Sequence, residues 1–571
     1  MVQARPIPIG IEFYKEMIDN GYYYIDKTLL IRDILAQKNK VTLFTRPRRF
    51  GKTLAQSMLQ AYFEKEILPD GTVIDNSKYF YGKKIMETGE EYINHMGQYP
   101  VIFLSLKSAK QPFYKAAYEK IRDAIIYEYF RHRYLLEGEN LAPSQKKRYN
   151  SFMEETASPE DYATSLQFLS QCLEQYHKQK TIILIDEYDV PLENSYFRGF
   201  YNEMADFVRS LFESALKTNT SLGFAVVTGC LRISRESIFT GLNNFEVISV
   251  LDENYSEHFG FIQSEVDNMF SFYGLQDKTE EARLWYDGYI FGKTEVYNPW
   301  SIIKYVKDIV YGNTDFPKPY WSNTSSNSIV RDLIENADDI TRSELEELVA
   351  GRTIEKPVHE DITYGDIYES QDNLWNFLFF TGYLKAVGKR FENRKIYLSM
   401  KIPNEEILYI YENKIQNWMQ HKIEQEDLSG LVTAFEEGDC DNASDIITGQ
   451  LIDTISFYDY KEDYYHGFLA DLLKNNKKYL VKSNRESGLG RWFENGLVLK
   501  TPRIRRGRAI ILELKIASNI NDLEKGCENA LEQIERLHYD HDIINEGYTD
   551  ITKYGICFYK KECLVMLEDH Q

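Results

Sequence analysis

The residues of this chain that could most readily do chemistry lie between positions 41 and 53. An apolar run, Val41–Thr45, leads through a short turn into Gly51-Lys52-Thr53, which opens a segment with apolar residues at helical spacing. Strand, turn, Gly-Lys-Thr and helix form a phosphate-binding loop, where backbone N–H groups hold phosphates, the lysine neutralises charge and the threonine binds Mg²⁺. The predicted nucleotide contacts are Arg46, Arg49, Phe50, Gly51, Lys52, Thr53 and Leu54.

One position of this loop departs from the usual pattern. The first glycine of G-x-x-x-x-G-K-[ST] falls on Arg46. An arginine cannot adopt glycine's positive φ at low cost, so we expect the start of the loop to be reshaped. Arg46, Arg48 and Arg49 either grip phosphate oxygens or are solvated, and Arg46 is placed to replace glycine's backbone contact with a side-chain contact.

A second apolar run, Thr181–Ile185, ends in Asp186-Glu187. A buried strand would hold Asp186 at the edge of a sheet, in reach of Mg²⁺, with Glu187 where a general base orients the attacking water. The alternative is a core strand that ends in solvated acids. Combined with the loop, the pair favours ATP as ligand, Thr53 and Asp186 as Mg²⁺ ligands, and hydrolysis.

A third apolar run, Gly223–Thr228, ends in a polar residue where an ATPase would place a γ-phosphate sensor. Arg232 and Arg235 follow closely, and a guanidinium near the transferred phosphoryl group stabilises transition-state charge. It can act within one chain or from a neighbouring subunit, which is compatible with a homo-oligomer. The alternative is that both arginines pair with surface carboxylates.

The elements that must position these residues alternate between short β-branched runs and longer helical patterns. We expect five strands with little polar content, at Val41–Thr45, Val101–Leu106, Thr181–Ile185, Gly223–Thr228 and Phe245–Val250. Long connections and strands covered on both faces are typical of an α/β fold with a parallel sheet. This pattern fills residues 1–255.

The rest of the chain divides into three parts by character. Residues 256–400 predict a mixed, lid-like or winged-helix-like region, and 401–480 a helical linker with a break at Glu436–Asp439. From residue 481 the pattern becomes β-rich, then helical, and then forms a last strand near Tyr554–Phe558. Several domains are expected, because 571 residues exceed what one core supports.

Composition limits the class of protein. The hydrophobic share is 43%, and the net charge of −21 excludes a basic footprint over the whole chain, so any nucleic-acid contact must be local. The six cysteines form no CxxC pair, which argues against a zinc site or disulfide framework. No apolar signal core or membrane-length apolar run is present. We expect a cytoplasmic protein without a membrane partner.

Six segments together resemble the AAA-ATPase-like family of bacterial proteins. They are Tyr24–Thr28, Arg46–Thr53, Ile185–Asp189, Thr228–Asn244, Trp285–Gly292 and Val296–Ser301. In that family a P-loop domain is usually fused to a C-terminal domain of the PD-(D/E)xK nuclease superfamily. The resemblance implies an AAA-like ATPase domain over 1–255 and an α/β, restriction-endonuclease-like domain over 481–571. The Arg-Pro-Arg-Arg-Phe-Gly-Lys-Thr loop is the family's own form.

In the last domain, Ala509–Lys515 predicts a strand with Glu513 and Lys515 on one face. In a nuclease of this type the glutamate binds a divalent metal and the lysine orients or activates water. The alternative is an exposed strand with alternating charges. The resemblance adds Gln533, on the following helix, facing the active site. It also matches Leu480–Arg491 to the segment before a metal-binding aspartate.

That aspartate is missing. The family expects Gly-Arg-x-Asp before a strand, and here the position falls on Phe493 counted from Gly490-Arg491, or on Gly496 counted back from Leu-Val-Leu499. Glu494 lies between them and is the candidate second metal ligand. Losing one of two carboxylates would weaken Mg²⁺ binding sharply. An arginine cluster in a predicted turn contacts phosphate or is solvated: Arg503, Arg505, Arg506 and Arg508.

Three functions remain open from the sequence. The first is an ATPase whose nucleotide state controls a nuclease-like domain acting on DNA or RNA. The second is an ATPase switch with an inactive nuclease-like domain that binds nucleic acid or protein. The third is an assembly protein that binds nucleotide without hydrolysis, against which Glu187 argues, because a carboxylate after the Mg²⁺ aspartate is what hydrolysis requires.

Overall fold

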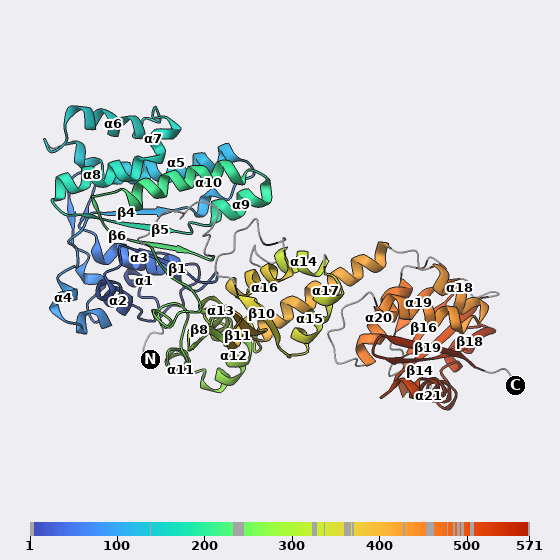
Figure 1. The fold of residues 1–571 in the computed structure, drawn as a ribbon. Coiled ribbons are helices and arrows are strands. Elements are labelled where there is room, and N and C mark those ends of the chain that lie inside the picture. The colour runs from blue at the N-terminus through green and yellow to red at the C-terminus, as the bar shows by residue number, and fades with distance from the viewer. Residues whose placement is uncertain are drawn as a thin grey trace. The chain divides into compact units, whose positions relative to one another are not determined.

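A computed structural model describes most of the chain. The described residues are 5–137, 139–231, 245–321, 328–335, 337–358, 367, 370–425, 429–452, 462–474, 476, 478–483, 486–487, 491–492, 496–502 and 507–568. The chain forms two compact units: unit 1 contains residues 1–324 and 353–409, and unit 2 contains 325–352 and 410–571. Figure 1 shows the elements of both units.

The centre of unit 1 is a five-stranded parallel sheet in the order β4-β5-β6-β1-β7. Its strands are β1 (Val41–Thr45), β4 (Val101–Ser105), β5 (Thr181–Asp186), β6 (Leu222–Gly229) and β7 (Phe245–Ile248). All five predicted strands and their parallel arrangement are confirmed. Every residue of β1 and β5 is buried, as apolar strands covered on both faces should be.

Helices cover both faces of this sheet, as Figure 1 shows. One face carries α1 (Tyr14–Asp19), α2 (Leu29–Gln37) and α3 (Lys52–Phe63). On the other face lie α5 (Tyr114–Arg131), α8 (Ser165–His177), α9 (Val190–Arg198) and α10 (Tyr201–Phe212). Three short helices complete this part: α4 (Glu90–Ile93), α6 (Pro143–Met153) and α7 (Pro159–Ala163), with the strand pair β2 (Glu66–Ile67) and β3 (Val73–Ile74).

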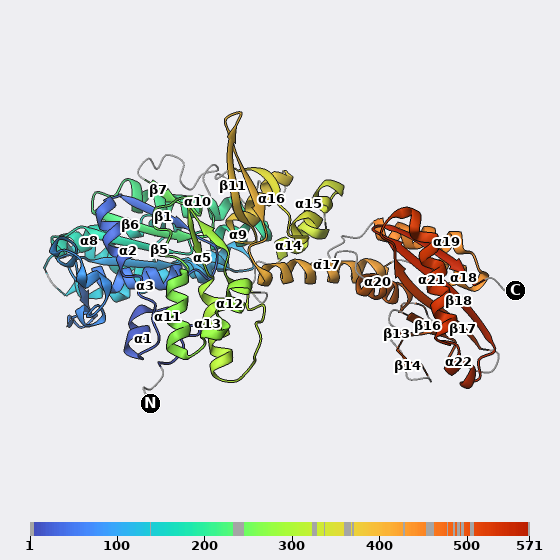
Figure 2. The same cartoon turned by 90° about the horizontal axis from the view of Figure 1, so that it is seen from below.

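The remainder of unit 1 is mixed helix and strand. Its elements are α11 (Gln263–Tyr273), α12 (Thr279–Tyr286), β8 (Tyr289–Phe291), β9 (Thr294–Val296), α13 (Pro299–Val310), β10 (Ile354–Val358), α16 (Gln371–Phe380), β11 (Lys385–Glu392) and β12 (Lys395–Lys401). Helix α17 (Glu405–Gln425) follows them. Strand β12 pairs antiparallel with both β10 and β11, and Figure 2 shows the β11–β12 hairpin projecting from its surroundings.

The motif Tyr24–Thr28 joins distant parts of unit 1. The Asp26 carboxylate accepts hydrogen bonds from the backbone N–H groups of Thr28 and Lys84, both within 2.9 Å. Lys27 Nζ pairs with Glu265 Oε2 at 2.6 Å, and this links the motif to α11. These contacts give the motif a structural role.

Unit 2 is built on the mixed sheet β13-β16-β17-β18-β19. The strands are β13 (Leu480–Ser483), β16 (Gly496–Lys500), β17 (Arg508–Ile516), β18 (Asp550–Tyr559) and β19 (Glu562–Leu567), and the pair β14 (Glu486–Ser487) and β15 (Arg491–Trp492) lies outside it. Strands β17 and β18 are parallel, and the other neighbours are antiparallel.

The helices of unit 2 cover the sheet from two sides. On one side lie α18 (Ser429–Glu437), α19 (Cys440–Ile452) and α20 (Glu462–Lys474). The Tyr465 ring of α20 stacks on the Phe558 ring of β18, with their centroids 4.3 Å apart. On the other side α21 (Leu523–Arg536) packs Ile534 against Val498 and Ile511. The remaining helices are α14 (Ser328–Glu335), α15 (Asp339–Val349) and α22 (His541–Asn545).

Two expectations for this region meet the structure differently. The predicted break at Glu436–Asp439 is confirmed, because α18 ends at Glu437 and Gly438 has φ 76°. The prediction that the strand near Tyr554–Phe558 is the last one is wrong. Lys560, with φ 53°, turns the chain into β19, which pairs antiparallel with β18.

The four-part domain division stays a prediction, since compactness groups residues 1–255 with most of 256–400 and places 325–352 with the C-terminal sheet. Among the helices of the described residues, none has both the length and the apolar character needed to cross a membrane.

Candidate functional site

The phosphate-loop lysine is buried against its own loop. Gly51, with φ 83°, precedes the first residue of α3, a backbone geometry that glycine adopts without strain. Lys52 is 5% exposed, and its Nζ donates to the carbonyl oxygens of Arg46 and Pro47, each at 2.9 Å. The ammonium group therefore lies over the loop, where arriving phosphate oxygens would take over from these carbonyls.

The Asp186 carboxylate receives one hydroxyl on each oxygen. Thr53 Oγ1 donates to Oδ2 at 2.8 Å, and Thr228 Oγ1 donates to Oδ1 at 2.6 Å. Burial raises the pKa of Asp186, and the two threonine hydrogen bonds act against that shift. Thr53 and Asp186 thus offer two adjacent oxygen ligands of the kind that Mg²⁺ prefers.

The structure brings Thr228 to Asp186, which was not the contact predicted for it. Thr228 is 1% exposed, and its hydroxyl orients the acid at the end of the neighbouring strand. Whether it also senses a γ-phosphate stays a prediction.

Glu187 follows Asp186 in a left-handed backbone conformation, with φ 53°. Burial raises the pKa of its half-buried carboxyl group, the Lys52 charge lowers it, and the carboxylates of Asp186 and Asp189 raise it further. A non-glycine residue with positive φ at such a position is costly and is characteristic of functional sites. The raised pKa suits a group that accepts a proton from water.

Two residues of this site were missed by the sequence analysis. Gln56, fully buried on α3, donates from Nε2 to the carbonyl oxygens of Ile185, at 3.2 Å, and Val226, at 3.1 Å. It fixes α3 beneath the ends of β5 and β6. A polar residue inside an otherwise apolar helical pattern was the signal for it.

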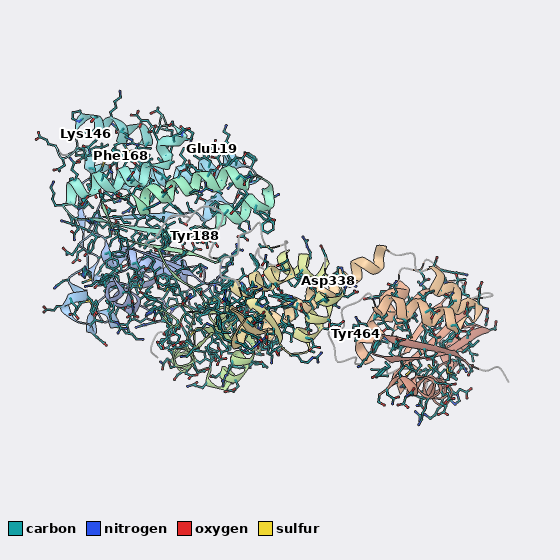
Figure 3. All side chains as sticks on the ribbon, viewed as in Figure 1. Glu119, Lys146, Phe168, Tyr188, Asp338 and Tyr464 are labelled. Atoms are coloured by element: carbon teal, nitrogen blue, oxygen red, sulfur yellow. The ribbon has the colours of Figure 1, made fainter. Side chains whose placement is uncertain are left out.

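The second missed residue is Asp189. Its Oδ2 accepts the backbone N–H groups of Cys230, at 2.8 Å, and Leu231, at 3.2 Å. Tyr188, labelled in Figure 3, packs so closely on Gly229 that a Cβ there would lie 2.4 Å from its ring. This anchors the chain just before Arg232 and Arg235, which lie outside the described residues. The third acid in Asp-Glu-Tyr-Asp was the available signal.

The loop arginines are placed differently from one another. The Arg46 side chain is fully buried and donates from Nη1 to the carbonyl oxygens of Thr45, at 3.0 Å, and Ile248, at 2.9 Å. It is therefore not one of the solvated arginines that the sequence allowed. Arg48 pairs with Glu193.

Arg49 is exposed at the turn of the loop. Its φ is 72°, and its guanidinium lies 4.2 Å from the centroid of the Trp300 ring, at the start of α13. Among the predicted nucleotide contacts, Arg49 has an exposed side chain that could reach a phosphate. Partial desolvation by the surrounding protein lowers the pKa of Arg49, and the carboxylates of Glu12 and Glu187 oppose that shift.

The remaining predicted loop contacts have structural surroundings. Phe50 is 1% exposed and packs on the rings of Tyr289 and Phe291, whose centroids lie 5.0 and 5.1 Å from the centroid of the Phe50 ring. Leu54 is half-buried in the first turns of α3. For Phe50 only the backbone is placed to contact a nucleotide.

In unit 2 the predicted E-x-K residues come together. Lys515 Nζ lies 3.4 Å from Glu513 Oε1, and Gln533 Nε2 donates to the same oxygen at 2.7 Å. Gln533 also donates to Tyr539 Oη at 3.0 Å, a contact the sequence did not reveal. Glu513 is fully buried, which excludes the alternative of an exposed strand with alternating charges.

The antiparallel register of β16 and β17 places Gly496 directly opposite Glu513. Residues opposite one another share a face of the sheet, so this is the position from which a second carboxylate would meet Glu513. It carries no side chain. Glu494 and Phe493 lie outside the described residues, as do Arg503, Arg505 and Arg506. Arg508 pairs with Asp550 at 2.8 Å.

Among the described residues, no cluster of three or more histidine, cysteine, aspartate or glutamate side chains has the arrangement of a metal site. An ion at either site would therefore rest on few protein ligands, which is common for Mg²⁺.

Comparison with known families agrees with this geometry. Residues 8–239 match the family model described as "Predicted AAA-ATPase", and residues 460–568 match that of the "PD-(D/E)XK nuclease superfamily". The N-terminal domain is AAA-ATPase-like and the C-terminal domain is nuclease-like. The recognition made from the six sequence segments is confirmed.

The AAA-ATPase-like match contains β1, β4, β5 and β6. Strand β7 lies beyond its end, as do Tyr289 and Phe291, whose rings contact Phe50. The nuclease-superfamily match contains Glu513, Lys515 and Gln533, and it begins after α18 and α19. Both candidate sites therefore lie within the matched regions.

A relative from Azotobacter chroococcum mcd 1, described as "Uncharacterized protein in vnfD 5'region", is 27% identical over 343 residues. The match covers 58% of this chain and 57% of the relative, so the chain spans little more than half of that protein's length.

Proposed function

We propose that the AAA-ATPase-like domain binds ATP with Mg²⁺ and hydrolyses it, and that its nucleotide state controls the nuclease-like domain. The observation that carries the proposal is the hydrogen bond from Thr53 to Asp186, at 2.8 Å, beside the buried ammonium of Lys52. It joins the phosphate loop to an acidic strand end, which is the arrangement that phosphoryl transfer requires.

The chain's own groups have distinct roles in this reaction. The loop N–H groups and Lys52 bind the β- and γ-phosphates, and Arg49 adds an exposed guanidinium. Thr53 and Asp186 would hold Mg²⁺, which would supply positive charge against the negative charge that develops on the phosphates. Glu187 accepts the proton of the attacking water. Arg232 and Arg235 stay candidates for transition-state stabilisation, from the same chain or from a second copy.

In the nuclease-like domain, Glu513 is the proposed metal ligand, Lys515 orients or activates water, and Gln533 holds the glutamate in place. The 3.4 Å and 2.7 Å contacts to one Glu513 oxygen support this assignment. The substrate class is DNA or RNA, contacted locally because the chain is acidic overall. Glu494 stays the predicted second carboxylate.

A second function is favoured by Gly496. Because the position opposite Glu513 has no carboxylate, the nuclease-like domain is instead a module that binds nucleic acid or protein, switched by ATP. A plasmid-nicking assay with Mg²⁺ or Mn²⁺, with and without ATP, separates the two. Cleavage that disappears in Glu513→Ala and Lys515→Ala supports the nuclease, and binding of DNA without cleavage supports the module.

The N-terminal assignment is tested by equilibrium ATP binding. Wild-type protein should bind ATP more tightly with Mg²⁺ than with EDTA, and Lys52→Ala should lose most of that affinity. Equal affinity in both proteins would contradict the phosphate-loop assignment. A cytoplasmic location and a homo-oligomeric state also belong to the proposal, and sedimentation with and without ATP tests the second.

A further inference from the structure

Arg46 is a buried cation that no carboxylate of the described residues pairs with. Its side chain is 0% exposed, and Nη1 bonds to two carbonyl oxygens, while Nε and Nη2 have no hydrogen-bond partner within the part of the chain that the structure describes. The guanidinium lies between the rings of Phe291 and Phe259, at 5.1 and 5.4 Å from their centroids. Its contacts are thus aromatic faces and neutral carbonyls.

This arrangement is unfavourable for the folded protein by itself. Burial lowers the pKa of Arg46 to about 9, with Asp252 opposing the shift from a distance, so the group is still charged at neutral pH. A buried charge is expensive unless it is paired and fully hydrogen-bonded. Two nitrogens without partners, which together carry three N–H donors, add to that cost.

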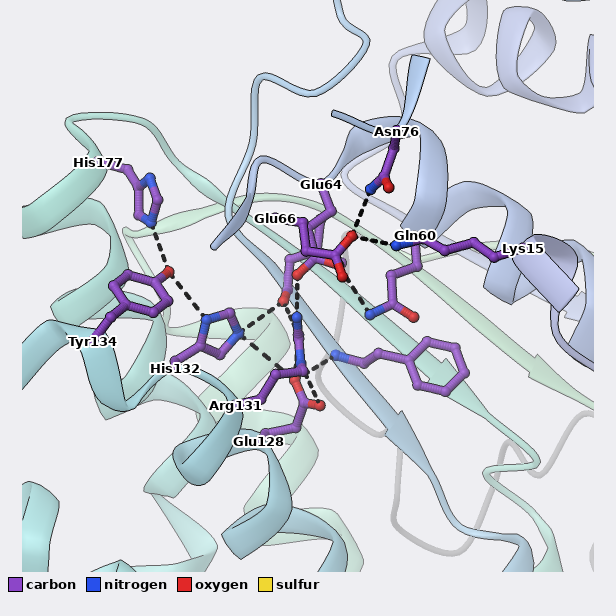
Figure 4. Close-up of polar contacts among 12 residues, drawn as sticks. Lys15, Gln60, Glu64, Glu66, Asn76, Glu128, Arg131, His132, Tyr134 and His177 are labelled. Carbon is purple, nitrogen blue, oxygen red and sulfur yellow. Dashed lines mark hydrogen bonds and ion pairs between the residues drawn. The ribbon is translucent and has the colours of Figure 1, made fainter. Parts of the chain in front are cut away.

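The same domain shows how this chain accommodates a half-buried arginine by pairing. Arg131 contacts the carboxylates of Glu64 and Glu128, with Nη2 of Arg131 2.7 Å from Glu128 Oε2 (Figure 4). Burial lowers the pKa of Arg131, but the two carboxylates outweigh it and hold the pKa well above its usual range. Arg131 has two carboxylates in ion-pair contact, whereas Arg46 has no such contact among the described residues and only the through-space effect of Asp252.

The location of Arg46 indicates what would compensate its charge. Its backbone N–H donates to the Gly229 carbonyl at 3.1 Å, which continues the pairing of β1 with β6, and its carbonyl accepts Lys52 Nζ. The backbone of Arg46 is therefore held at the first position of the phosphate loop, and its guanidinium extends from there into the interior. In a water-excluded region, a fixed charge acts on neighbouring anions far more strongly than it does in water.

We propose that Arg46 acts on the nucleotide through space: its unpaired buried charge favours polyphosphate binding at the loop, at the expense of the stability of the nucleotide-free protein. This deepens the proposed ATP-binding function and rests on it. Arg46 is then a positioning residue that sets the affinity of the loop for anions without touching the phosphates. If Arg46 acts through its charge, its effect on affinity should grow with the negative charge of the nucleotide. A purely structural role would affect all nucleotides equally.

The test compares ATP, ADP and AMP binding to wild type, Arg46→Lys and two neutral variants, Arg46→Gln and Arg46→Met, by calorimetry at fixed Mg²⁺ and ionic strength. The neutral variants should weaken the binding of ATP by about tenfold or more, that of ADP by less and that of AMP least, because the interaction scales with ligand charge. Arg46→Lys keeps the charge and should keep the graded affinity. Without nucleotide, the neutral variants should unfold at or above the wild-type temperature.

Arg131→Gln is the matched control, because it removes a half-buried guanidinium that has carboxylate partners. It should lower the unfolding temperature sharply, since it leaves two buried carboxylates unpaired, and any effect on binding should be the same for ATP, ADP and AMP.

Three results would overturn the inference. Equal loss of ATP, ADP and AMP in the neutral variants would leave Arg46 a structural residue while the proposed function stands. Failure of both neutral variants to fold would show that the charge stabilises the free protein. If wild-type protein binds no ATP at all, the proposed function fails, and the inference fails with it.

Discussion

Thr53 Oγ1 and Asp186 Oδ2 are joined by a 2.8 Å hydrogen bond between the first turn of α3 and the end of β5. The two residues are 133 positions apart in the sequence. The parallel order β5-β6-β1 brings them together, and Thr228, on β6 between them, holds the other oxygen of Asp186. The ends of β5 and β6 thus supply Asp186 and the hydroxyl that orients it, and the first turn of α3 supplies the second proposed Mg²⁺ ligand.

Thr53→Ala should make ATP binding insensitive to Mg²⁺. It removes one proposed metal ligand and leaves Lys52 and the loop N–H groups in place. We expect affinity in Mg²⁺ to fall by about tenfold or more, or ~1.4 kcal/mol, with little change in EDTA. Thr53→Ser keeps the hydroxyl and serves as the control. A variant that retains the full Mg²⁺ effect would remove Thr53 from the metal site.

Glu187→Gln should separate binding from hydrolysis. The amide is isosteric but accepts no proton at neutral pH, so kcat should fall by about 10²- to 10³-fold, while ATP affinity stays within a few-fold of wild type. Single-turnover hydrolysis of radiolabelled ATP measures the first quantity, and equilibrium binding the second. Turnover close to wild type would exclude Glu187 as the base.

Glu406 should make unit 1 less stable as the pH rises from 4.5 through neutrality. Its fully buried carboxyl group accepts hydrogen bonds from Ser301 Oγ, at 2.7 Å, and Trp321 N, at 2.9 Å, yet burial raises its pKa from 4.5 to about 7. The folded state therefore binds the proton more tightly, and stability present below pH 4.5 is lost as pH rises towards 7.

The full change is about 3 kcal/mol for this single group. Thermal unfolding between pH 5 and 8 should show a decline in wild type that is smaller in Glu406→Gln, which carries no titrating group. Parallel pH profiles for the two proteins would contradict the assignment.

Gly496→Asp should strengthen metal-dependent chemistry in the nuclease-like domain. The register places a side chain at 496 on the same face as Glu513, so an aspartate there would add a carboxylate at the position opposite Glu513. We expect plasmid nicking in Mn²⁺ to rise at least about tenfold. Gly496→Asn is the matched control for side-chain volume. Identical nicking by the aspartate and asparagine variants would show that this position does not serve the metal.

The parallel sheet and the Lys52–Thr53–Asp186 constellation were predictable because they depend on local patterns. Strands β1 and β5 are mostly apolar in sequence and buried throughout, and strand ends in a parallel sheet meet at one edge. Glu513 and Lys515 followed from the two-residue period of a strand. Each of these inferences needs only neighbouring residues.

What could not be predicted depends on contacts made far along the chain. The Arg46 side chain is held in the interior by contacts with Ile248, Phe259 and Phe291, which lie more than 200 positions later in the sequence. The partners of Asp189 are backbone N–H groups 41 and 42 positions away. Strand β19 was overlooked because Lys560 makes a tight turn through a backbone conformation that lysine rarely adopts.

The most direct test of the central claim is steady-state ATP hydrolysis by purified full-length protein, with and without Mg²⁺, in wild type and Lys52→Ala. The account predicts Mg²⁺-dependent phosphate release in wild type and its loss in Lys52→Ala, with both proteins folded by circular dichroism. Equal phosphate release by the two proteins would contradict it.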